Sequence, residues 1–327
     1  MSHRHPDFPD VGRSVLYAIG RTPLIALERI GRGLPGLVLA KLEYFSPGHS
    51  VKDRIALRMI EDAERDGRLR PGQPVVELTS GNTGTGLAIA CAIKGYRFIA
   101  VMSEGNSMER RRMLQALGAE LELVPQVGGP RPGQVSREDL EAVEARAEAL
   151  TRELGAFRPD QFGNPSNPRV HEETTGVEIW EQTGGRVDVW VANVGTAGTF
   201  VGVARALKTR RPEVRCIACE PATAPALAGG PITDTCHRLE GTGYAQIPPQ
   251  WDPAVCDGFV TVTDDEAIAT ARRLAREEGI FVGFSSGGNV AAALRLAAAA
   301  RPGAVIVTTC NDTGLKYLST DLFPRSP

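Results

Sequence analysis

Residues 50–54 read Ser-Val-Lys-Asp-Arg, and residues 79–84 read Thr-Ser-Gly-Asn-Thr-Gly. The first stretch predicts a helix over Val51–Arg65 with Ser50 as its N-cap. Lys52 then lies in the first turn, where the positive end of the helix dipole makes its amine easier to deprotonate. A neutral amine can form a Schiff base with an aldehyde cofactor. The second stretch can bring backbone N–H groups and short polar side chains onto an anion. Taken singly, the first stretch also fits a solvated lysine on a helix, and the second also fits an ordinary turn. Their combination is what indicates a cofactor site.

Strand and helix patterns alternate along the chain, which predicts an α/β fold with mainly parallel sheets covered by helices. The predicted strands are 37–42, 75–78, 98–102, 120–124, 187–194, 215–220 and 304–309. The predicted helices are 51–65, 83–94, 108–117, 139–154, 200–209, 265–278 and 289–300. A Gly/Pro-rich stretch over 128–133 predicts a surface loop.

Composition narrows the classes of partner. The net charge is −2 and the isoelectric point about 6.3, so no basic field favours a nucleic acid or an anionic membrane. We expect no membrane span, no secretory signal and a cytoplasmic protein. Cys216 and Cys219 form a C-x-x-C, but on a strand they face opposite sides, so we expect packing and no metal site.

The segment Gly195–Thr199 follows an apolar strand and opens a helix, a position that favours a phosphate group. A dinucleotide-binding unit would use the same pattern. Gly195, Gly198 and Gly202 open the helix, and Glu220 ends the next strand, where an acidic residue would hold a ribose. This region alone fits either a phosphate-bearing cofactor or a dinucleotide. A dehydrogenase, however, would not explain Lys52 and the 79–84 loop.

In this order and wording, the segments resemble the pyridoxal-phosphate enzymes of the cysteine synthase and cystathionine β-synthase family. Nine segments carry the resemblance: 20–24, 50–54, 80–84, 107–110, 161–165, 195–199, 240–244, 284–288 and 312–318. The resemblance implies a two-lobe, fold-type II enzyme related to the tryptophan synthase β chain. It implies a smaller lobe over 42–156, a larger lobe over 1–41 plus 157–327, and a homodimer.

The resemblance also implies roles for individual residues. Lys52 would hold pyridoxal phosphate as a Schiff base and act on the substrate α-proton, and Asn82 would bond the ring 3′-oxygen. The phosphate group would bind Gly195, Thr196, Ala197, Gly198 and Thr199. Ser285 would contact the pyridine nitrogen, although its place before a helix is also that of an N-cap. Because a hydroxyl does not hold this nitrogen protonated as a carboxylate would, the ring is a weaker electron sink, which suits β-elimination. The substrate carboxylate would bind Thr79, Ser80, Thr83 and Gln161.

Departures from the family pattern concern the second substrate. His49 stands directly before Ser50, where the family commonly reads P-G-G-S or P-A-G-S, and it is either an exposed loop residue or a proton shuttle. Tyr244, after Gly241, resembles the cystathionine β-synthases more than the cysteine synthases. Ala197 replaces a usual glycine in the phosphate loop. We therefore treat Gly241, Tyr244 and His49 as candidate determinants of the nucleophile.

These features predict a pyridoxal-phosphate enzyme that performs β-replacement on an activated L-serine, such as O-acetylserine or O-phosphoserine. The nucleophile would be sulfide or another thiol, and the simplest product is cysteine. Alternatives within the same chemistry are a cystathionine β-synthase-like use of serine with homocysteine, a cysteine desulfhydrase and another β-substituted alanine synthase. From a different class, a nicotinamide-dependent dehydrogenase stays open through Glu220.

Overall fold

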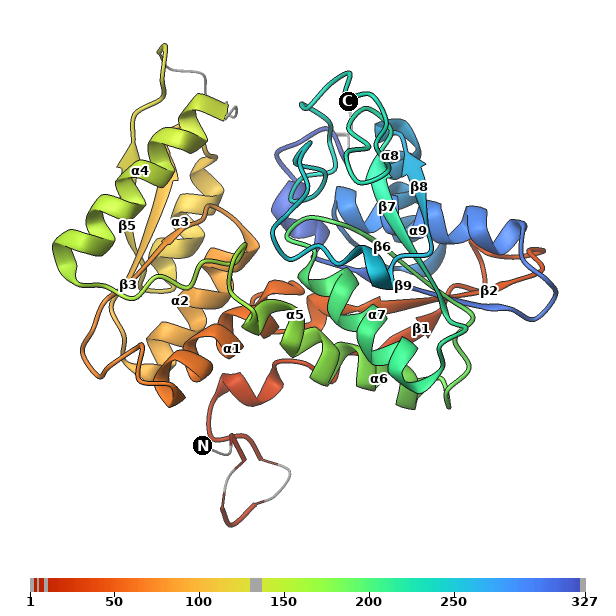
Figure 1. Cartoon of the computed structure of the whole chain (residues 1–327), viewed down its shortest axis with the longest axis horizontal. Coiled ribbons are helices and arrows are strands. Elements are labelled where there is room, and N and C mark those ends of the chain that lie inside the picture. Colours follow the sequence, from red (N-terminus) through yellow and green to blue (C-terminus); the bar gives the residue numbers. More distant parts are fainter. Residues whose placement is uncertain (1–2, 5, 9–10, 130–136, 324–327) are drawn as a thin grey trace. The chain divides into compact units, whose positions relative to one another are not determined.

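The computed structural model describes residues 3–4, 6–8, 11–129 and 137–323 (Figure 1). The chain forms two compact units. Unit 1 comprises residues 1–19 and 46–166, and unit 2 comprises residues 20–45 and 167–327. The sequence instead predicts boundaries at 41/42 and 156/157 and assigns the first residues to the larger lobe. No helix in the described part of the chain is long and apolar enough to cross a membrane.

Unit 1 is built on a parallel sheet in the order β3-β4-β5. Its strands are β3 (Val75–Leu78), β4 (Phe98–Ser103) and β5 (Glu120–Val124), and its helices are η1 (Val15–Ala18), α1 (Lys52–Arg65), α2 (Asn82–Lys94), α3 (Met108–Ala116) and α4 (Arg137–Leu154). One sheet face packs Val76, Ile99 and Val101 against Val143 and Leu150 of α4. The parallel order and helical cover are those of an α/β unit, as predicted.

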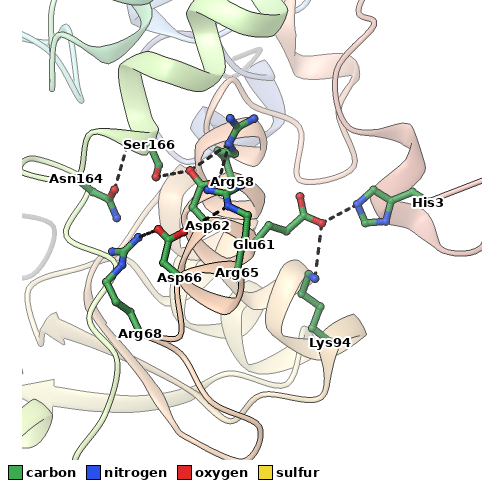
Figure 2. Close-up of polar contacts among 10 residues, drawn as sticks. All are labelled: His3, Arg58, Glu61, Asp62, Arg65, Asp66, Arg68, Lys94, Asn164 and Ser166. Atoms are coloured by element: carbon green, nitrogen blue, oxygen red, sulfur yellow. Dashed lines mark hydrogen bonds and ion pairs between the residues drawn. The ribbon is translucent and has the colours of Figure 1, made fainter. Parts of the chain in front are cut away.

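A buried carboxylate ties α1 to the end of unit 1 (Figure 2). Asp62 is 1% exposed and accepts hydrogen bonds from Arg58 Nε at 2.9 Å and Ser166 Oγ at 2.6 Å. Arg65 pairs with the same carboxylate at 2.7 Å. Because a buried charge is costly unless it is paired and hydrogen-bonded, these partners explain why Asp62 is tolerated. They also fix the helix that begins at Lys52.

Unit 2 holds a six-stranded sheet in the order β1-β2-β9-β6-β7-β8. Its strands are β1 (Leu24–Ala26), β2 (Leu37–Leu42), β6 (Val189–Asn193), β7 (Arg215–Pro221), β8 (Gly258–Val262) and β9 (Val305–Cys310). All neighbours are parallel except β1 and β2, which pair antiparallel. The sequence did not predict β1 or β8.

Helices cover both faces of the unit 2 sheet. They are η2 (Glu43–Phe45), α5 (Ser166–Val170, which starts at the last residue of unit 1), η3 (His171–Thr175), α6 (Gly176–Gln182), α7 (Gly198–Arg210), η4 (Pro253–Val255), α8 (Asp264–Arg273), η5 (Leu274–Glu278), α9 (Phe284–Ala298) and η6 (Gly314–Tyr317). One apolar cluster contains Cys219 with residues of α8 and α9, and another contains Cys216 with residues of α6 and α7. The two thiols therefore face opposite sides of β7, as expected for packing residues.

Candidate active site

Lys52 is the first residue of α1 and is half-buried. The residue before the helix is Val51, which has helical dihedral angles and makes no side-chain capping bond. The helix is thus assigned one residue later than predicted, although Val51 already has helical dihedral angles. Ser50 still contributes, since its Oγ accepts the Lys52 N–H at 3.3 Å and lies 3.5 Å from Asp53 Oδ1.

The 79–84 segment joins β3 to α2, and α2 begins at Asn82, one residue earlier than predicted. Thr79 is buried, and its Oγ1 accepts the Gly84 N–H at 2.8 Å. A Cβ on Gly84 would lie 2.8 Å from Thr79 Cγ2, so this close turn requires glycine. Ser80 and Asn82 are half-buried at the helix start, where backbone N–H groups favour an anion.

Gln161 lies on the same side of unit 1 as this loop. Thr83 Oγ1 donates to Gln161 Oε1 across 2.6 Å. The bond brings Gln161 to the turn that Thr79 closes through Gly84. Thr83 uses its hydroxyl hydrogen to hold Gln161, so the donors left for a carboxylate without an arginine are the Thr79 hydroxyl, the Gln161 NH₂ group and the α2 N-terminus.

Glu77 is a neighbour of this loop that the sequence prediction missed. It is 2% exposed, and its Oε2 accepts the backbone N–H of Asp160 at 2.7 Å. Asp160 has φ of 51°, in the left-handed region, immediately before Gln161. Burial raises the pKa of Glu77 to about 8, against the opposing effect of Arg158. In the sequence, the signal that could have identified Glu77 is an acidic residue inside an otherwise apolar strand, two residues before the polar 79–84 loop.

The Gly195–Thr199 segment lies in unit 2 between β6 and the start of α7 at Gly198. Ala197 has φ of 70°, a left-handed conformation that precedes the helix and turns successive N–H groups toward one side. A Cβ on Gly195 would overlap the Gly241 carbonyl oxygen, and one on Gly198 would overlap Asn167 Oδ1. Both positions therefore require glycine, because neighbouring atoms already occupy the space that a side chain would need.

Two side chains hold the hydroxyls of this loop. Asn167 Nδ2 donates to Thr196 Oγ1 at 2.9 Å, and Thr199 Oγ1 lies 3.2 Å from His171 Nε2. His171 is fully buried, and its Nδ1 lies 2.9 Å from Thr175 Oγ1. The helix N-terminus, the left-handed Ala197 and the supported threonine hydroxyls fit a phosphate group.

The same region does not fit a dinucleotide. Gly202 packs against the Pro168 carbonyl oxygen, a packing role that a glycine of a dinucleotide-binding unit can also have, so the decision depends on Glu220. The Glu220 carboxylate accepts the N–H groups of Leu227 and Ala228 at 2.7 and 2.9 Å. Glu220 is 2% exposed and closes its own loop. Its structural contacts remove the observation on which the dehydrogenase alternative depended.

Ser285 is the second residue of α9, whose N-cap is Gly283. The alternative that Ser285 is the N-cap, and the predicted helix start at Asn289, are therefore wrong; the Ser-Ser-Gly-Gly run is helical because it is buried against neighbouring residues. Ser285 is 5% exposed, and its Oγ accepts a hydrogen bond from Asn311 Nδ2 at 3.2 Å.

The three candidate determinants of the nucleophile lie on loops. Gly241 has φ of 79° and lies against Gly195 in unit 2. Tyr244, three residues later, is 43% exposed. His49 in unit 1 is exposed and has φ of 57°.

No group of three or more His, Cys, Asp or Glu side chains in the described ranges is arranged to hold a metal ion. Taken by itself, unit 1 offers a lysine at a helix start, which suits an aldehyde. Taken by itself, unit 2 offers a helix N-terminus that suits a phosphate group, and a buried serine.

Comparison with known proteins agrees with these features. A family model described as pyridoxal-phosphate dependent enzyme matches residues 15–312. A cysteine synthase of Staphylococcus aureus is 43% identical over 311 residues, which are 95% of this chain and 96% of that protein. The chain belongs to the pyridoxal-phosphate-dependent enzyme family.

Solved structures give the same fold. The structure of an O-ureido-L-serine synthase matches with a TM-score of 0.87 and 43% identity over 96% of this chain and 95% of that one. O-acetylserine sulfhydrylase isoform 3 of Entamoeba histolytica matches with a TM-score of 0.88 and 34% identity over 100% and 96%. A hydrogen sulfide-producing enzyme of Fusobacterium nucleatum matches with a TM-score of 0.86 and 37% identity over 94% and 99%. The predicted fold-type II architecture and the cofactor are confirmed.

Proposed function

We propose that this enzyme performs β-replacement on an activated L-serine, with sulfide as the simplest nucleophile and L-cysteine as the product. The observation that carries the proposal is the combination of Lys52 at the start of α1 with the donor turn formed by Thr79, Thr83 and Gln161. The cysteine synthase and sulfhydrylase relatives support the same chemistry.

When bound, pyridoxal phosphate supplies an electron sink conjugated to the substrate α-carbon. We assign covalent attachment of the cofactor to Lys52 Nζ. Once free of the cofactor, the Lys52 amine would take the substrate α-proton and later return it. The β-substituent leaves with its bonding electrons, and the sulfur of the nucleophile forms the new bond to the β-carbon. With O-acetylserine and hydrogen sulfide, the balanced products are cysteine and acetic acid.

The remaining candidate residues orient the reactants. We assign the substrate carboxylate to Thr79, Ser80, Thr83 and Gln161, and the ring 3′-oxygen to Asn82. In unit 2, the phosphate group is assigned to 195–199 and the pyridine nitrogen to Ser285. The Cβ-excluding glycines and the supported threonines favour the first assignment, and the burial of Ser285 favours the second.

Two of the structural relatives favour a second candidate at the same site. One is named an O-ureido-L-serine synthase and another a hydrogen sulfide-producing enzyme. We therefore also propose that a different nucleophile, or release of sulfide from cysteine, is compatible with this set of residues. In both cases the roles of Lys52 and of the carboxylate-binding turn are unchanged.

The first experiment separates these substrates. O-acetylserine, O-phosphoserine, serine and cysteine are added singly to the purified enzyme while the cofactor absorbance is followed, and products are identified after sulfide or another nucleophile is added. We expect an O-activated serine to change the spectrum and sulfide to restore it with formation of cysteine. A response to cysteine alone, with sulfide released, would establish the desulfhydrase instead.

The second experiment tests the attachment site. Borohydride reduction followed by peptide mass mapping should find a pyridoxyl group on Lys52, and Lys52→Ala should abolish it. The Lys41 peptide serves as the control and should carry no pyridoxyl group, because its fully buried amine is already paired with Glu178 at 2.7 Å. A pyridoxyl group on any peptide other than that of Lys52 would overturn the assignment.

We also propose that the enzyme works in the cytoplasm as a homodimer. All six cysteines are free, and four of them are buried, which suits a reducing compartment. Light scattering coupled to gel filtration should give twice the 35.0 kDa chain mass. A monomeric mass would contradict the dimer.

A further inference from the structure

Asn311 follows β9 and contacts Ser285, and the established motifs of the sequence give it no role. Its side-chain Nδ2 is the donor that Ser285 Oγ accepts at 3.2 Å. Its backbone N–H donates to Ser286 Oγ at 2.9 Å, which fixes the position of Asn311 beside the start of α9. The direction of the side-chain bond matters because a hydroxyl that accepts from one neighbour has its hydrogen left for another.

The direction can be derived from backbone groups, whose donor and acceptor roles are fixed. The Asn193 N–H donates to Asn289 Oδ1 at 2.6 Å, so the other end of the Asn289 amide is the NH₂ group. That NH₂ group lies 2.9 Å from the backbone oxygen of Thr309 and 3.0 Å from Thr309 Oγ1. Asn289 and Thr309 are fully buried, so no water competes for these bonds.

The next bond follows from the first. Because Thr309 Oγ1 accepts from Asn289, its own hydrogen is available to Asn311 Oδ1, 2.7 Å away. The opposite orientation of the Asn311 amide would place its NH₂ group 3.5 Å from the NH₂ group of Asn289, where Oδ1 now lies. Two donors would then face each other, which is unfavourable in a buried site. The Asn311 oxygen therefore faces Thr309, and its NH₂ group faces Ser285.

The chain of bonds ends at Ser285. Its Oγ accepts from Asn311, and among the described residues no group accepts the Ser285 hydroxyl hydrogen. Asn193 Nδ2 holds the Ser285 backbone oxygen at 2.9 Å, so the residue is fixed at both its backbone and its side chain. The hydroxyl is thus presented as a donor to whatever lies against it.

We propose that Asn311 is a positioning residue that holds the Ser285 hydroxyl as a hydrogen-bond donor, so that the cofactor's pyridine nitrogen is kept unprotonated. This inference rests on the proposed contact between Ser285 and that nitrogen. A nitrogen that accepts a hydrogen bond retains its lone pair, and a ring without the extra positive charge is the weaker electron sink that suits β-replacement. Asn311 thereby limits reactions that require a more stabilised carbanion.

The test replaces Asn311 and reads the protonation of the ring nitrogen directly. The holoenzyme is reconstituted with pyridoxal phosphate carrying ¹⁵N in the ring, and the ¹⁵N resonance is recorded. Asn311→Asp has almost the same shape but accepts hydrogen bonds only. Both flanking hydroxyls would then donate to the carboxylate, and Ser285 would present a lone pair to the ring. We expect an upfield shift toward the resonance of a protonated nitrogen, which Ser285→Asp defines.

Two further variants guard against a general loss of structure. Asn311→Ala removes the donor without adding charge and should shift the resonance part of the way. Thr308→Val is the matched control, because the buried Thr308 Oγ1 donates to the Val191 oxygen at 2.7 Å, outside this chain of bonds. It should lower the thermal unfolding temperature without moving the resonance.

The outcomes separate the inference from the proposed site. A resonance that moves in Ser285→Asp but in neither Asn311 variant would overturn the role of Asn311 while leaving Ser285 at the ring. A resonance that moves in none of the three would remove Ser285 from the ring nitrogen, and with it the basis of the inference. A partial shift in Asn311→Ala and a larger shift in Asn311→Asp would support the inference.

Discussion

Glu77 Oε2 accepts the backbone N–H of Asp160 across 2.7 Å, and this bond joins β3 to the residue immediately before Gln161. The carboxyl is almost wholly buried, and Arg158 Nε lies 3.9 Å from its other oxygen. The bond holds Asp160 at a positive φ, a conformation that costs energy for a residue other than glycine. Glu77 therefore supports the position from which Gln161 reaches Thr83.

We predict that Glu77→Gln flattens the dependence of stability on pH. Burial raises the pKa of Glu77 from 4.5 to about 8, so between these values the folded protein binds more protons than the unfolded chain. Its contribution to stability is fully present below about pH 4.5 and is lost as the pH rises toward 8, by up to about 1.4 kcal/mol per pH unit. Glutamine keeps an acceptor for the Asp160 N–H and does not ionise.

Urea unfolding at several pH values between 5 and 8 measures this effect. The variant should gain stability relative to the wild type as the pH rises. The exposed Glu104, changed to glutamine, serves as the control and should leave the slope unchanged. Parallel stability curves for the wild type and Glu77→Gln would show that Glu77 does not change its protonation in this range.

Ala197→Gly should stabilise the protein by about 0.5–1 kcal/mol. The left-handed conformation of Ala197 costs about 1–2 kcal/mol for a residue with a Cβ, and glycine removes this cost while adding some unfolded-chain entropy. Ala204→Gly, in the interior of the same helix, is the control with the opposite sign and should destabilise by about 1 kcal/mol. A loss of stability in both variants would mean that Ala197 is not strained.

Gly198→Ala should weaken binding of pyridoxal phosphate and lower the free energy of unfolding by about 1–3 kcal/mol. The added methyl group would overlap Asn167 Oδ1 and displace the amide that donates to Thr196. In the background of Asn167→Ala, the same change should cost less, because the obstructing group is gone. A double-mutant cycle with no coupling would contradict this geometry.

Changes at His49 and Tyr244 should alter capture of the nucleophile more than release of the leaving group. His49→Asn tests the imidazole, because asparagine tolerates the positive φ of this position. Tyr244→Ala removes the exposed ring. Rapid mixing with the first substrate alone, and then with sulfide, separates the two steps, and about a tenfold effect confined to the second is expected for lost pocket contacts. Slowing of the first step alone would assign both residues to the first substrate.

The sequence predicted much of the fold because its parallel strands are short, mostly aliphatic runs, even though some include a charged residue such as Lys41, Glu77 or Glu122. Leu37–Leu42, Val75–Leu78 and Glu120–Val124 have the predicted bounds. Single-residue shifts occur at helix starts, as at Asn82, where the polar residues of a turn and of a first helical turn have the same character. The predicted loop over 128–133 lies partly outside the described residues.

What the sequence did not predict depends on contacts between distant segments. Nothing in the sequence near Glu220 shows that its carboxylate is occupied by Leu227 and Ala228. Asn311 stands far from Ser285 in the sequence, and only the register of β9 beside β6 and the packing of α9 bring them together.

The pairing of β2 with β9 has a consequence for how the chain is made. Leu37 pairs with Val305 and Leu42 with Cys310, so β2 leaves the ribosome long before its parallel neighbour exists. Residues 46–166 form the bulk of unit 1 and can collapse during synthesis, since domains fold as units from the N-terminal end. The apolar strand β2 must meanwhile stay unpaired along one edge. Truncation anywhere before β9 therefore leaves an exposed strand edge, and nascent or shortened chains should depend on chaperones until translation is complete.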